Sequence, residues 1–222
     1  MMIRIHIDGE LKIGSNAPLS DAQKHYLNGV MRLKPGDKFV VFGGGKEFLA
    51  EMPGTIISET GRADTANGAT LAFCPVKPAR MEEMISMATQ IGVAKFQPVI
   101  SKFTDIPKMN FQRFRKIAIE ASEQCGRISI PEFLPAKKFA EFVSGAENLF
   151  YGDERPPTEN RKAIFDSPAR GEFILLIGPE GGFAPEEFAM LEKSGARGIS
   201  LGPTILRAET AAALGLAKLL LI

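Results

Sequence analysis

The sequence predicts an α/β protein in which a small β-barrel precedes a larger α/β domain with a mainly parallel sheet. In residues 1–75, short segments of strand character alternate with glycine turns, and a single helical segment accompanies them. This pattern is typical of a small barrel. In residues 76–222, strands alternate with helices, and this order favours a parallel sheet. We therefore expect two domains with a boundary near residue 75.

The charge distribution is uneven along the chain. The 222 residues can form one large domain or two small ones, and the formal net charge is only +1. Residues 71–138 nevertheless carry 11 basic and 6 acidic side chains, whereas residues 139–222 carry 8 basic and 12 acidic ones. The basic segment is compatible with a polyanionic partner, although most surface charges serve only to solvate the fold.

The sequence gives no sign of a metal site, a redox motif or a membrane span. Cys74 and Cys125 are far apart, and the isolated histidines His6 and His25 do not make a metal site. The N-terminus has no apolar signal core, and the final apolar run is too short to cross a bilayer. We therefore expect a cytoplasmic protein without a bound metal.

The elements of the first domain follow from local patterns. Alternating apolar and polar residues at 3–7 predict a half-buried strand. Ser20 is the expected N-cap of a helix whose apolar side chains continue to Leu33. Further strands are expected at residues 38–42, 47–52, 54–59 and 69–74.

In the second domain, helical periodicity predicts a helix at 81–91 that ends at Gly92, and a second helix at 111–125. Apolar runs predict strands at 96–100, 149–152 and 173–177. Pro185 and the two glutamates after it indicate a helix start, because proline is tolerated there and acids suit the positive helix end. An apolar helix closes the chain.

Two glycine turns, each after a strand, predict a ligand pocket. The first turn occupies residues 178–183 and the second residues 200–203. Glycines allow the chain to approach a ligand closely and to present bare N–H and C=O groups. The phosphate-binding signatures Gly-x-Gly-x-x-Gly and Gly-Lys-Ser/Thr are absent from both turns. The turns therefore indicate a site built largely from backbone, although simple tight turns explain the same glycines.

Several motifs occur in a specific order. The chain reads Ile-Gly-Pro-Glu-Gly-Gly-Phe at 177–183 and Ile-Leu-Arg at 205–207, followed by Glu-Thr-Ala at 209–211. Two further segments, 88–93 and 117–127, complete the series. Together these motifs resemble the uracil-N3 methyltransferases of small-subunit ribosomal RNA (the methyltransferase E family), which belong to the SPOUT superfamily. The segment Arg-Leu-Lys-Pro-Gly-Asp after Met31 resembles the PUA-like RNA-binding barrels of that family.

The resemblance implies a trefoil-knotted SPOUT domain over residues 76–222, a PUA-like RNA-binding barrel over residues 1–75, and a homodimer. The implied cofactor is S-adenosylmethionine, and the implied substrate is uracil N3 of 16S ribosomal RNA in the small ribosomal subunit. The cofactor-binding residues that it implies are Leu175, Ile177, Gly178, Pro179, Glu180, Gly181, Gly182, Ser200, Leu201, Gly202, Ile205, Leu206 and Thr210.

The resemblance also suggests which residues act on the uracil. Arg207 would stabilise the anion that forms when N3 loses its proton, and Glu180 or Glu209 would accept that proton. A solvated arginine and a helix-start acid are the structural alternatives for Arg207 and Glu209. Thr204 stands where this family usually has arginine. The candidates for contacts with RNA are Arg4, Arg32, Lys34 and Arg127.

Three other functions are compatible with these motifs. An RNA-binding module that has lost catalysis would bind RNA without consuming cofactor. A SPOUT enzyme with another target would methylate a transfer RNA base or a ribose 2′-oxygen. An unrelated α/β nucleotide-binding protein would have to match the ordered motifs by chance.

Overall fold

The structure is a computed structural model in which the chain divides into two compact units. The residues that it describes are 2–62, 68–105, 109–155, 169 and 171–221. The first unit combines residues 1–65 with residues 119–130, and the second combines residues 66–118 with residues 131–222. Helix α3 (Phe111–Cys125) therefore begins in the second unit and ends in the first.

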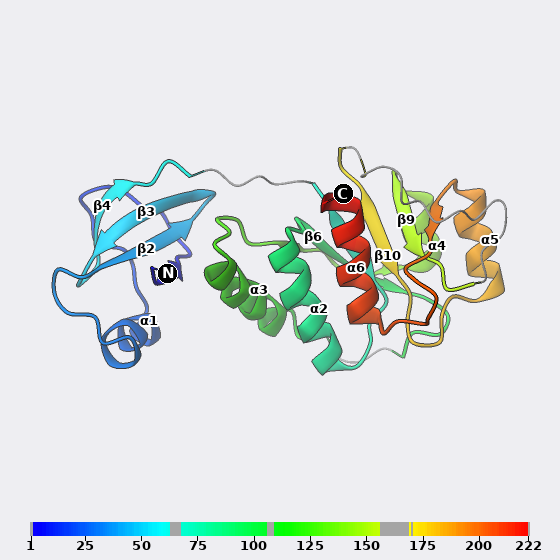
Figure 1. Ribbon diagram of the computed structural model, residues 1–222, viewed down its shortest axis with the longest axis horizontal. Helices are drawn as coiled ribbons and strands as arrows, with labels where there is room; N and C mark the ends of the chain where they lie inside the picture. Colours follow the sequence, from blue (N-terminus) through cyan, green and yellow to red (C-terminus); the bar gives the residue numbers. More distant parts are fainter. Residues whose placement is uncertain (1, 63–67, 106–108, 156–168, 170, 222) are drawn as a thin grey trace. The chain divides into compact units, whose positions relative to one another are not determined.

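The first unit contains a four-stranded sheet in the order β1-β2-β3-β4, and Figure 1 labels its strands β2, β3 and β4. Strand β1 pairs parallel with β2, whereas the pairs β2–β3 and β3–β4 are antiparallel. The apolar side chains of the strands and Leu27 form one buried core. The strands are β1 (Arg4–His6), β2 (Lys38–Gly43), β3 (Lys46–Glu51) and β4 (Thr55–Glu59).

The predicted helix after Ser20 is confirmed, but its second half is a π-helix. Ser20 and Gln23 form a capping box at the start of α1 (Asp21–His25). The chain then continues as η1 (Tyr26–Val30). Arg32 follows with a positive φ of 55°, a conformation that is uncommon for a residue other than glycine.

The second unit is built on a parallel sheet in the order β11-β9-β10-β5-β6-β7, and β8 pairs with β6. Every pairing is parallel, as expected from the alternation of strands and helices. The strands are β5 (Thr70–Phe73), β6 (Lys95–Ile100), β7 (Glu132–Phe133), β8 (Lys137–Lys138), β9 (Leu149–Gly152), β10 (Ile174–Ile177) and β11 (Arg197–Ile199).

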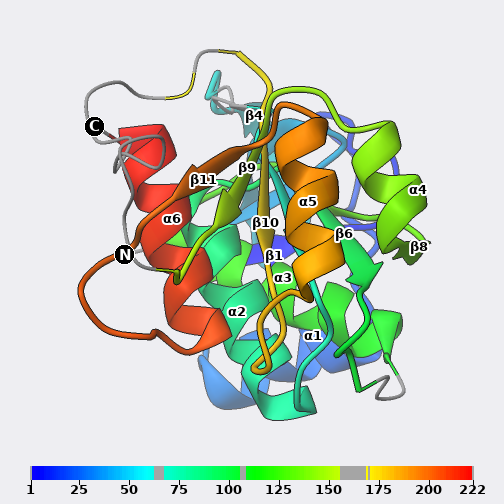
Figure 2. The same cartoon turned by 90° about the vertical axis from the view of Figure 1, so that its right-hand side faces the viewer.

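Helices cover both faces of this sheet. Helices α2 and α6 pack against each other on one face, and α4 and α5 pack against each other on the other (Figure 2). Gly92 ends α2 in the left-handed conformation, as predicted. No helix in the described part of the chain is both long and apolar enough to cross a membrane. The helices other than α3 are α2 (Pro78–Ile91), α4 (Phe139–Ser144), α5 (Pro185–Lys193) and α6 (Ala208–Leu221).

The assignment of residues 69–74 to the barrel needs correction. In the structure these residues form β5, which lies between β10 and β6 in the second unit. Residues 71–73 are all fully buried, as in a strand of a parallel sheet that is covered on both faces. A half-buried barrel strand would instead alternate buried and exposed side chains.

Candidate active site

A cavity of about 400 Å³ lies at the carboxyl ends of β9, β10 and β11. Because parallel strands end at the same edge of a sheet, the loops that follow these three strands converge there. The loops after β10 and β11 are the two predicted glycine turns. The cavity volume falls in the range of small-molecule sites.

Most of the predicted cofactor-binding residues line this cavity. The lining residues predicted from the sequence are Ile177, Gly178, Pro179, Glu180, Gly182, Leu201, Gly202, Ile205, Leu206 and, among the catalytic candidates, Arg207. Five other residues predicted to bind the cofactor or to act in catalysis lie outside the lining: Leu175, Gly181, Ser200, Glu209 and Thr210.

Leu175, which the resemblance implies as a cofactor-binding residue, lies behind the cavity wall. Leu175 and Ile177 occupy the same face of β10 because they are two residues apart. Leu175 lies one step farther from the strand end, however, and it is fully buried. A Cβ atom added to Gly215 of α6 would come within 2.7 Å of Leu175 Cδ2. Helix α6 therefore covers Leu175, and only Ile177 reaches the cavity.

The first glycine turn requires glycine at specific positions. Gly182 has a φ of +70°, and its N–H donates to the carbonyl oxygen of Pro179 at 2.9 Å. A Cβ atom at Gly178 would lie 3.1 Å from Cζ of Phe183. At Gly181, by contrast, φ is not positive and a Cβ atom would make ordinary contact with Phe103. The geometry thus demands glycine at 182 and favours it at 178, but not at 181.

A buried carboxylate stabilises this turn by accepting hydrogen bonds from the backbone. Glu187, in the first turn of α5, accepts the N–H of Ala184 at 2.9 Å and the N–H of Lys102 at 2.7 Å. The Glu187 residue is 6% exposed. Its two backbone bonds fix the end of the turn where α5 begins, which keeps the cavity wall in one conformation.

One wall of the cavity is apolar and open to solvent. Ile177, Leu201, Ile205 and Leu206 line it, and Ile205 is 79% exposed. A Cβ atom at Gly152 would lie 3.4 Å from Cδ1 of Ile177, so the glycine that ends β9 leaves room beside this wall. An exposed apolar wall of this kind is suited to a flat apolar group such as an adenine ring.

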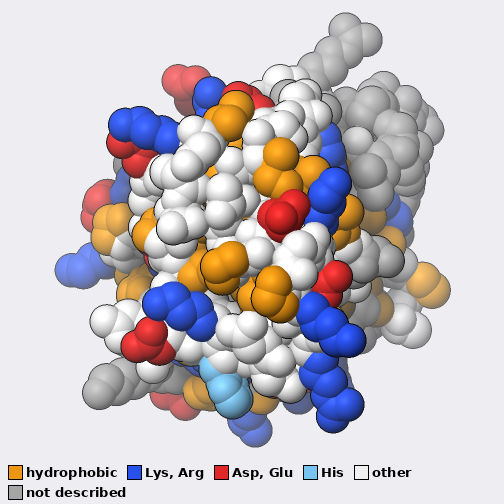
Figure 3. Space-filling view, turned by 90° about the vertical axis from the view of Figure 1, so that its left-hand side faces the viewer, with side chains coloured by type: hydrophobic (Ala, Val, Ile, Leu, Met, Phe, Trp, Pro, Cys, Tyr) orange, Lys and Arg blue, Asp and Glu red, His pale blue; other side chains and the backbone are white. Residues whose placement is uncertain are grey.

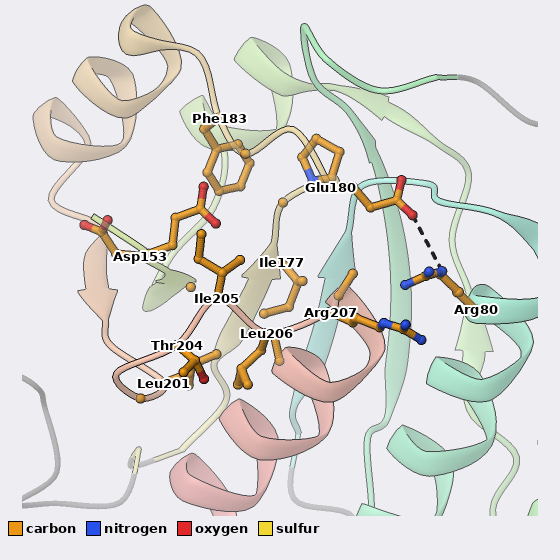
Figure 4. A pocket seen from close by; sticks show the side chains of 18 of the residues that line it. Arg80, Asp153, Ile177, Glu180, Phe183, Leu201, Thr204, Ile205, Leu206 and Arg207 are labelled. Carbon is orange, nitrogen blue, oxygen red and sulfur yellow. Dashed lines mark ion pairs between the residues drawn. The ribbon is translucent and has the colours of Figure 1, made fainter. Parts of the chain in front are cut away.

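A cluster of charged side chains forms another part of the site. Arg80, near the start of α2, lines the cavity. Its Nε lies 3.7 Å from Oε1 of Glu180, and its Nη1 lies 3.5 Å from Oε1 of Glu209. Figure 4 shows the Glu180 side chain opposite Arg80 and the Arg207 side chain pointing toward Arg80. Two arginines and two glutamates thus meet at one side of the cavity.

Arg80 is not among the site residues predicted from the sequence, although its position carries a signal. A cation in the first turn of a helix opposes the helix dipole, and Arg80 stands in the first turn of α2. Asp153 was missed as well. It follows the last residue of β9 and accepts from Nη2 of Arg155 at 2.7 Å, and this hydrogen bond raises the pKa of Arg155 above its ordinary value.

The predicted RNA contacts lie in the first unit and differ in accessibility. Arg4 is buried, forms an ion pair with Glu47, and donates from Nη2 to the Arg127 carbonyl oxygen at 2.7 Å. Its charge is therefore neutralised inside the unit and does not face a phosphate. Arg32 and Lys34 are exposed, whereas Arg127 is half-buried and donates to Ser129 Oγ at 3.0 Å.

On the face shown in Figure 3, basic side chains are dispersed, and acidic and hydrophobic groups lie among them. The surface view thus does not select one phosphate-binding patch among the candidates. In the described ranges, no cluster of three or more histidine, cysteine, aspartate or glutamate side chains could hold a metal ion.

Comparisons with known proteins match nearly the whole chain. The model of a family described as an RNA methyltransferase domain matches residues 64–220. The ribosomal RNA small subunit methyltransferase E of Rickettsia conorii is 33% identical over 99% of this chain and 95% of its own length. The Synechocystis protein of the same name is 30% identical over 99% of this chain and 77% of its own length.

Two solved structures agree with this result. A protein of Legionella pneumophila, described as a methyltransferase in complex with the cofactor SAM, is 30% identical and has a TM-score of 0.84, with 99% of this chain and 97% of that chain covered. The ribosomal RNA small subunit methyltransferase E of Neisseria gonorrhoeae, bound to S-adenosyl methionine, is 26% identical with a TM-score of 0.84, covering 98% and 96%. The chain therefore belongs to the family of ribosomal RNA small subunit methyltransferase E.

Proposed function

We propose that this protein uses S-adenosylmethionine to methylate N3 of a uracil in 16S ribosomal RNA of the small ribosomal subunit. The observation that carries the proposal is the composition of the cavity. An apolar wall and two glycine turns face one part of it, and the charged side chains of Arg80, Glu180 and Arg207 face another. Membership in the methyltransferase E family supports the same assignment.

The cavity fits the cofactor in both size and chemistry. Ile177, Leu201 and Ile205 offer an apolar surface to an adenine ring, and the glycines at 178, 182 and 202 allow a ligand to approach the backbone. S-adenosylmethionine, when bound, supplies a methyl group that is already activated on a sulfonium. The protein's own residues therefore have to align the two reactants and remove the N3 proton.

The charged side chains at the cavity can assist the removal of the N3 proton. Glu180 lines the cavity and its side chain is 50% exposed, so it can reach a substrate and accept the N3 proton. Arg207 is exposed and lines the same cavity, where it can stabilise the resulting anion. Glu209, the other candidate acceptor, has only 6% of its side chain exposed. Because N3 lies on the pairing edge of uracil, the target base must be unpaired or turned out of its helix.

The remaining parts of the proposal concern domains and partners. We assign RNA binding to a PUA-like barrel in the first unit, with Arg32 and Lys34 as its exposed contacts, and methyl transfer to a trefoil-knotted SPOUT domain formed by the second unit. The apolar character of α6 supports a homodimer. Ribosomal RNA as substrate supports a location in the cytoplasm. Sedimentation at several protein concentrations tests the dimer.

The test of the function is transfer of a tritiated methyl group to small ribosomal subunits from a strain that lacks this enzyme, followed by nucleoside analysis. The expected product is 3-methyluridine. Label in a 2′-O-methylated nucleoside would assign a different target. Binding of the cofactor without any labelled RNA would favour a module that has lost catalysis.

A further inference from the structure

We propose that Arg80 is a further catalytic residue of this reaction, whose guanidinium stabilises the negative charge that uracil gains when N3 loses its proton. The assignment rests on the proposed function. It also gives Glu209 a different role from the one predicted from sequence, because Glu209 then positions Arg80 instead of accepting the proton.

The guanidinium of Arg80 faces the cavity and retains hydrogen-bonding capacity. The side chain is 26% exposed, and it approaches Glu209 at 3.5 Å and Glu180 at 3.7 Å. Both contacts are ion pairs but are too long to be good hydrogen bonds. A guanidinium carries five N–H donors in a planar fork. Arg80 is therefore held by charge while its donors remain available for a planar acceptor in the cavity.

Glu209 is withdrawn from the cavity. Its side chain is 6% exposed, it is absent from the cavity lining, and its buried Oε2 has no hydrogen-bond partner among the described residues. A buried carboxylate is costly unless a cation compensates it. Arg80 supplies that cation. In this position Glu209 anchors the guanidinium at the cavity wall and is shielded from a bound base.

Two arginine side chains lie near each other at the cavity, and this arrangement indicates that the site binds an anion. Arg207 points toward Arg80 in Figure 4, although like charges repel. The carboxylates Glu180 and Glu209 offset part of this repulsion. A planar anion between the two guanidinium groups would offset more of it, and guanidinium donors match such an anion in pairs.

The chemistry requires this charge stabilisation. In the deprotonation step the N3–H bond breaks, the proton passes to a carboxylate oxygen of Glu180, and the electron pair remains on the ring, shared by N3, O2 and O4. A carboxylate is a weak base for an imide proton, so stabilisation of the anion has to drive the step. A preorganised guanidinium in a partly buried site provides more stabilisation than the same group in water.

The test compares wild type with Arg80→Gln and Arg80→Lys on small ribosomal subunits. Arg113→Gln is the matched control, because Arg113 also pairs with a residue of α2, Glu82, but does not line the cavity. We expect Arg80→Gln to lower kcat about 10²- to 10³-fold while the Kd for S-adenosylmethionine, measured by calorimetry, remains near that of wild type. Arg80→Lys should recover part of kcat, and Arg113→Gln should resemble wild type.

The pH profile provides a readout that a purely structural role would not change. Without the cation the uracil holds its N3 proton more tightly, so the rising limb of kcat should move to higher pH in Arg80→Gln. The charged groups that face Arg80 in the described structure are Glu180, Glu209 and Arg207, and all three remain in this variant. Circular dichroism of each variant checks that the fold is retained.

Several results would overturn the assignment while leaving the proposed function in place. If Arg80→Gln lost as much affinity for the cofactor as it lost in kcat, Arg80 would instead contact the cofactor carboxylate. A higher KM for RNA with kcat unchanged would place it on a phosphate, and an unimpaired Arg80→Gln would remove it from the reaction. A wild-type protein that forms no 3-methyluridine would overturn the proposed function, and the Arg80 assignment with it.

A double-mutant cycle tests Glu209 as a positioning residue. Glu209→Gln should lower kcat on its own, but it should add little loss in the Arg80→Gln background, because both changes disable the same guanidinium. Independent losses that multiply would show that Glu209 acts on the substrate itself and would contradict the positioning role.

Discussion

Nη1 of Arg80 lies 3.5 Å from Oε1 of Glu209, so an ion pair joins the first turn of α2 to the first turn of α6. A cation at the start of a helix is unfavourable and an anion there is favourable. Glu209 is thus stabilised both by the dipole of α6 and by its ion pair with Arg80. Arg80, by contrast, is disfavoured by the dipole of α2 and depends on Glu209 and Glu180 for compensating charge. An arginine held against its helix dipole beside a cavity is more easily explained by function than by stability.

Replacement of Arg207 by alanine should abolish most of the methyl transfer without unfolding the protein. Arg207 is exposed and lines the cavity, so its loss removes charge from the site but little packing. We expect kcat to fall about 10²-fold or more, with an unchanged thermal unfolding midpoint. Lys193→Ala, at an exposed position in the last turn of α5, is the control. Activity near wild type in Arg207→Ala would argue against its catalytic role.

The first glycine turn should be sensitive at position 182 and tolerant at position 181. Gly182→Ala forces a φ of +70° on a residue with a Cβ atom, which would also lie 2.6 Å from Oε1 of Glu154. We expect a loss of about 1–2 kcal/mol in unfolding free energy and weaker binding of S-adenosylmethionine by calorimetry. Gly181→Ala should show neither effect. Equal effects in the two variants would contradict this explanation of the turn.

The buried pair of Arg4 and Glu47 should make the first unit sensitive to acid. Burial works to raise the pKa of Glu47, but hydrogen bonds from Arg4 and Thr60 and the charges of Arg4 and Arg62 outweigh it, so this pKa lies below its ordinary value of 4.5. A carboxyl with a lowered folded pKa contributes stability that is complete above the unfolded pKa and is lost as pH falls through the folded one.

Urea unfolding of Glu47→Gln tests this relation. At pH 7 the variant should be less stable than wild type by about 3 kcal/mol, because the Arg4 guanidinium is left buried without a counter-charge. The difference should shrink as pH falls below 4.5. Glu59→Gln, which removes an exposed partner of Lys46 in the same sheet, should change stability by less than about 0.5 kcal/mol. A difference that did not depend on pH would rule out the electrostatic account.

The two cysteines should differ sharply in reactivity. Burial raises the pKa of the Cys74 thiol to about 11, whereas Cys125 is exposed. Because the thiolate is the reactive form, native protein at pH 8 should react with a thiol reagent at Cys125 only. Cys125→Ser should abolish the native reaction, and denaturant should restore reaction at Cys74. Rapid native labelling of Cys74 would contradict the buried position at the end of β5.

RNA binding should depend on Lys34 but not on every surface lysine. Lys34 is exposed in the turn after η1, and one lost phosphate contact should reduce the slope of log Kobs against log salt by about 1. Lys12→Gln is the control. Lys12 is also exposed and belongs to the same first unit, but its charge is paired with Glu10. Filter binding at several salt concentrations measures both. Identical slopes for Lys34→Gln and wild type would remove Lys34 from the RNA interface.

Local patterns in the sequence were sufficient for most elements that position the site. The apolar run before Gly178, the proline at the start of α5 and the glycine after α2 each have a local physical cause, and each prediction is confirmed. The short elements β7, β8 and α4 were not predicted, and the strand before residue 200, β11, was predicted without bounds, because segments of 2, 2, 6 and 3 residues show little periodicity.

Pairings between distant residues were beyond the reach of these patterns. Arg4 reads as a surface cation in an alternating strand, and only the position of Glu47 on β3 makes it a buried partner. Arg80 reads as one of several helix arginines until Glu180 and Glu209 are placed beside it. Charges acquire their roles from tertiary contacts, which no local pattern contains.

The first unit is assembled from two pieces of chain that are separated in the sequence by residues 66–118. The later piece contributes the carboxylate of Glu123, which accepts the N–H of His6, and the carbonyl of Arg127, which accepts from Arg4. A gene fragment that ended at residue 75 would leave both of these donors without their acceptors. Recombination that moved this unit intact into another protein would therefore have to carry residues 119–130 along with residues 1–65.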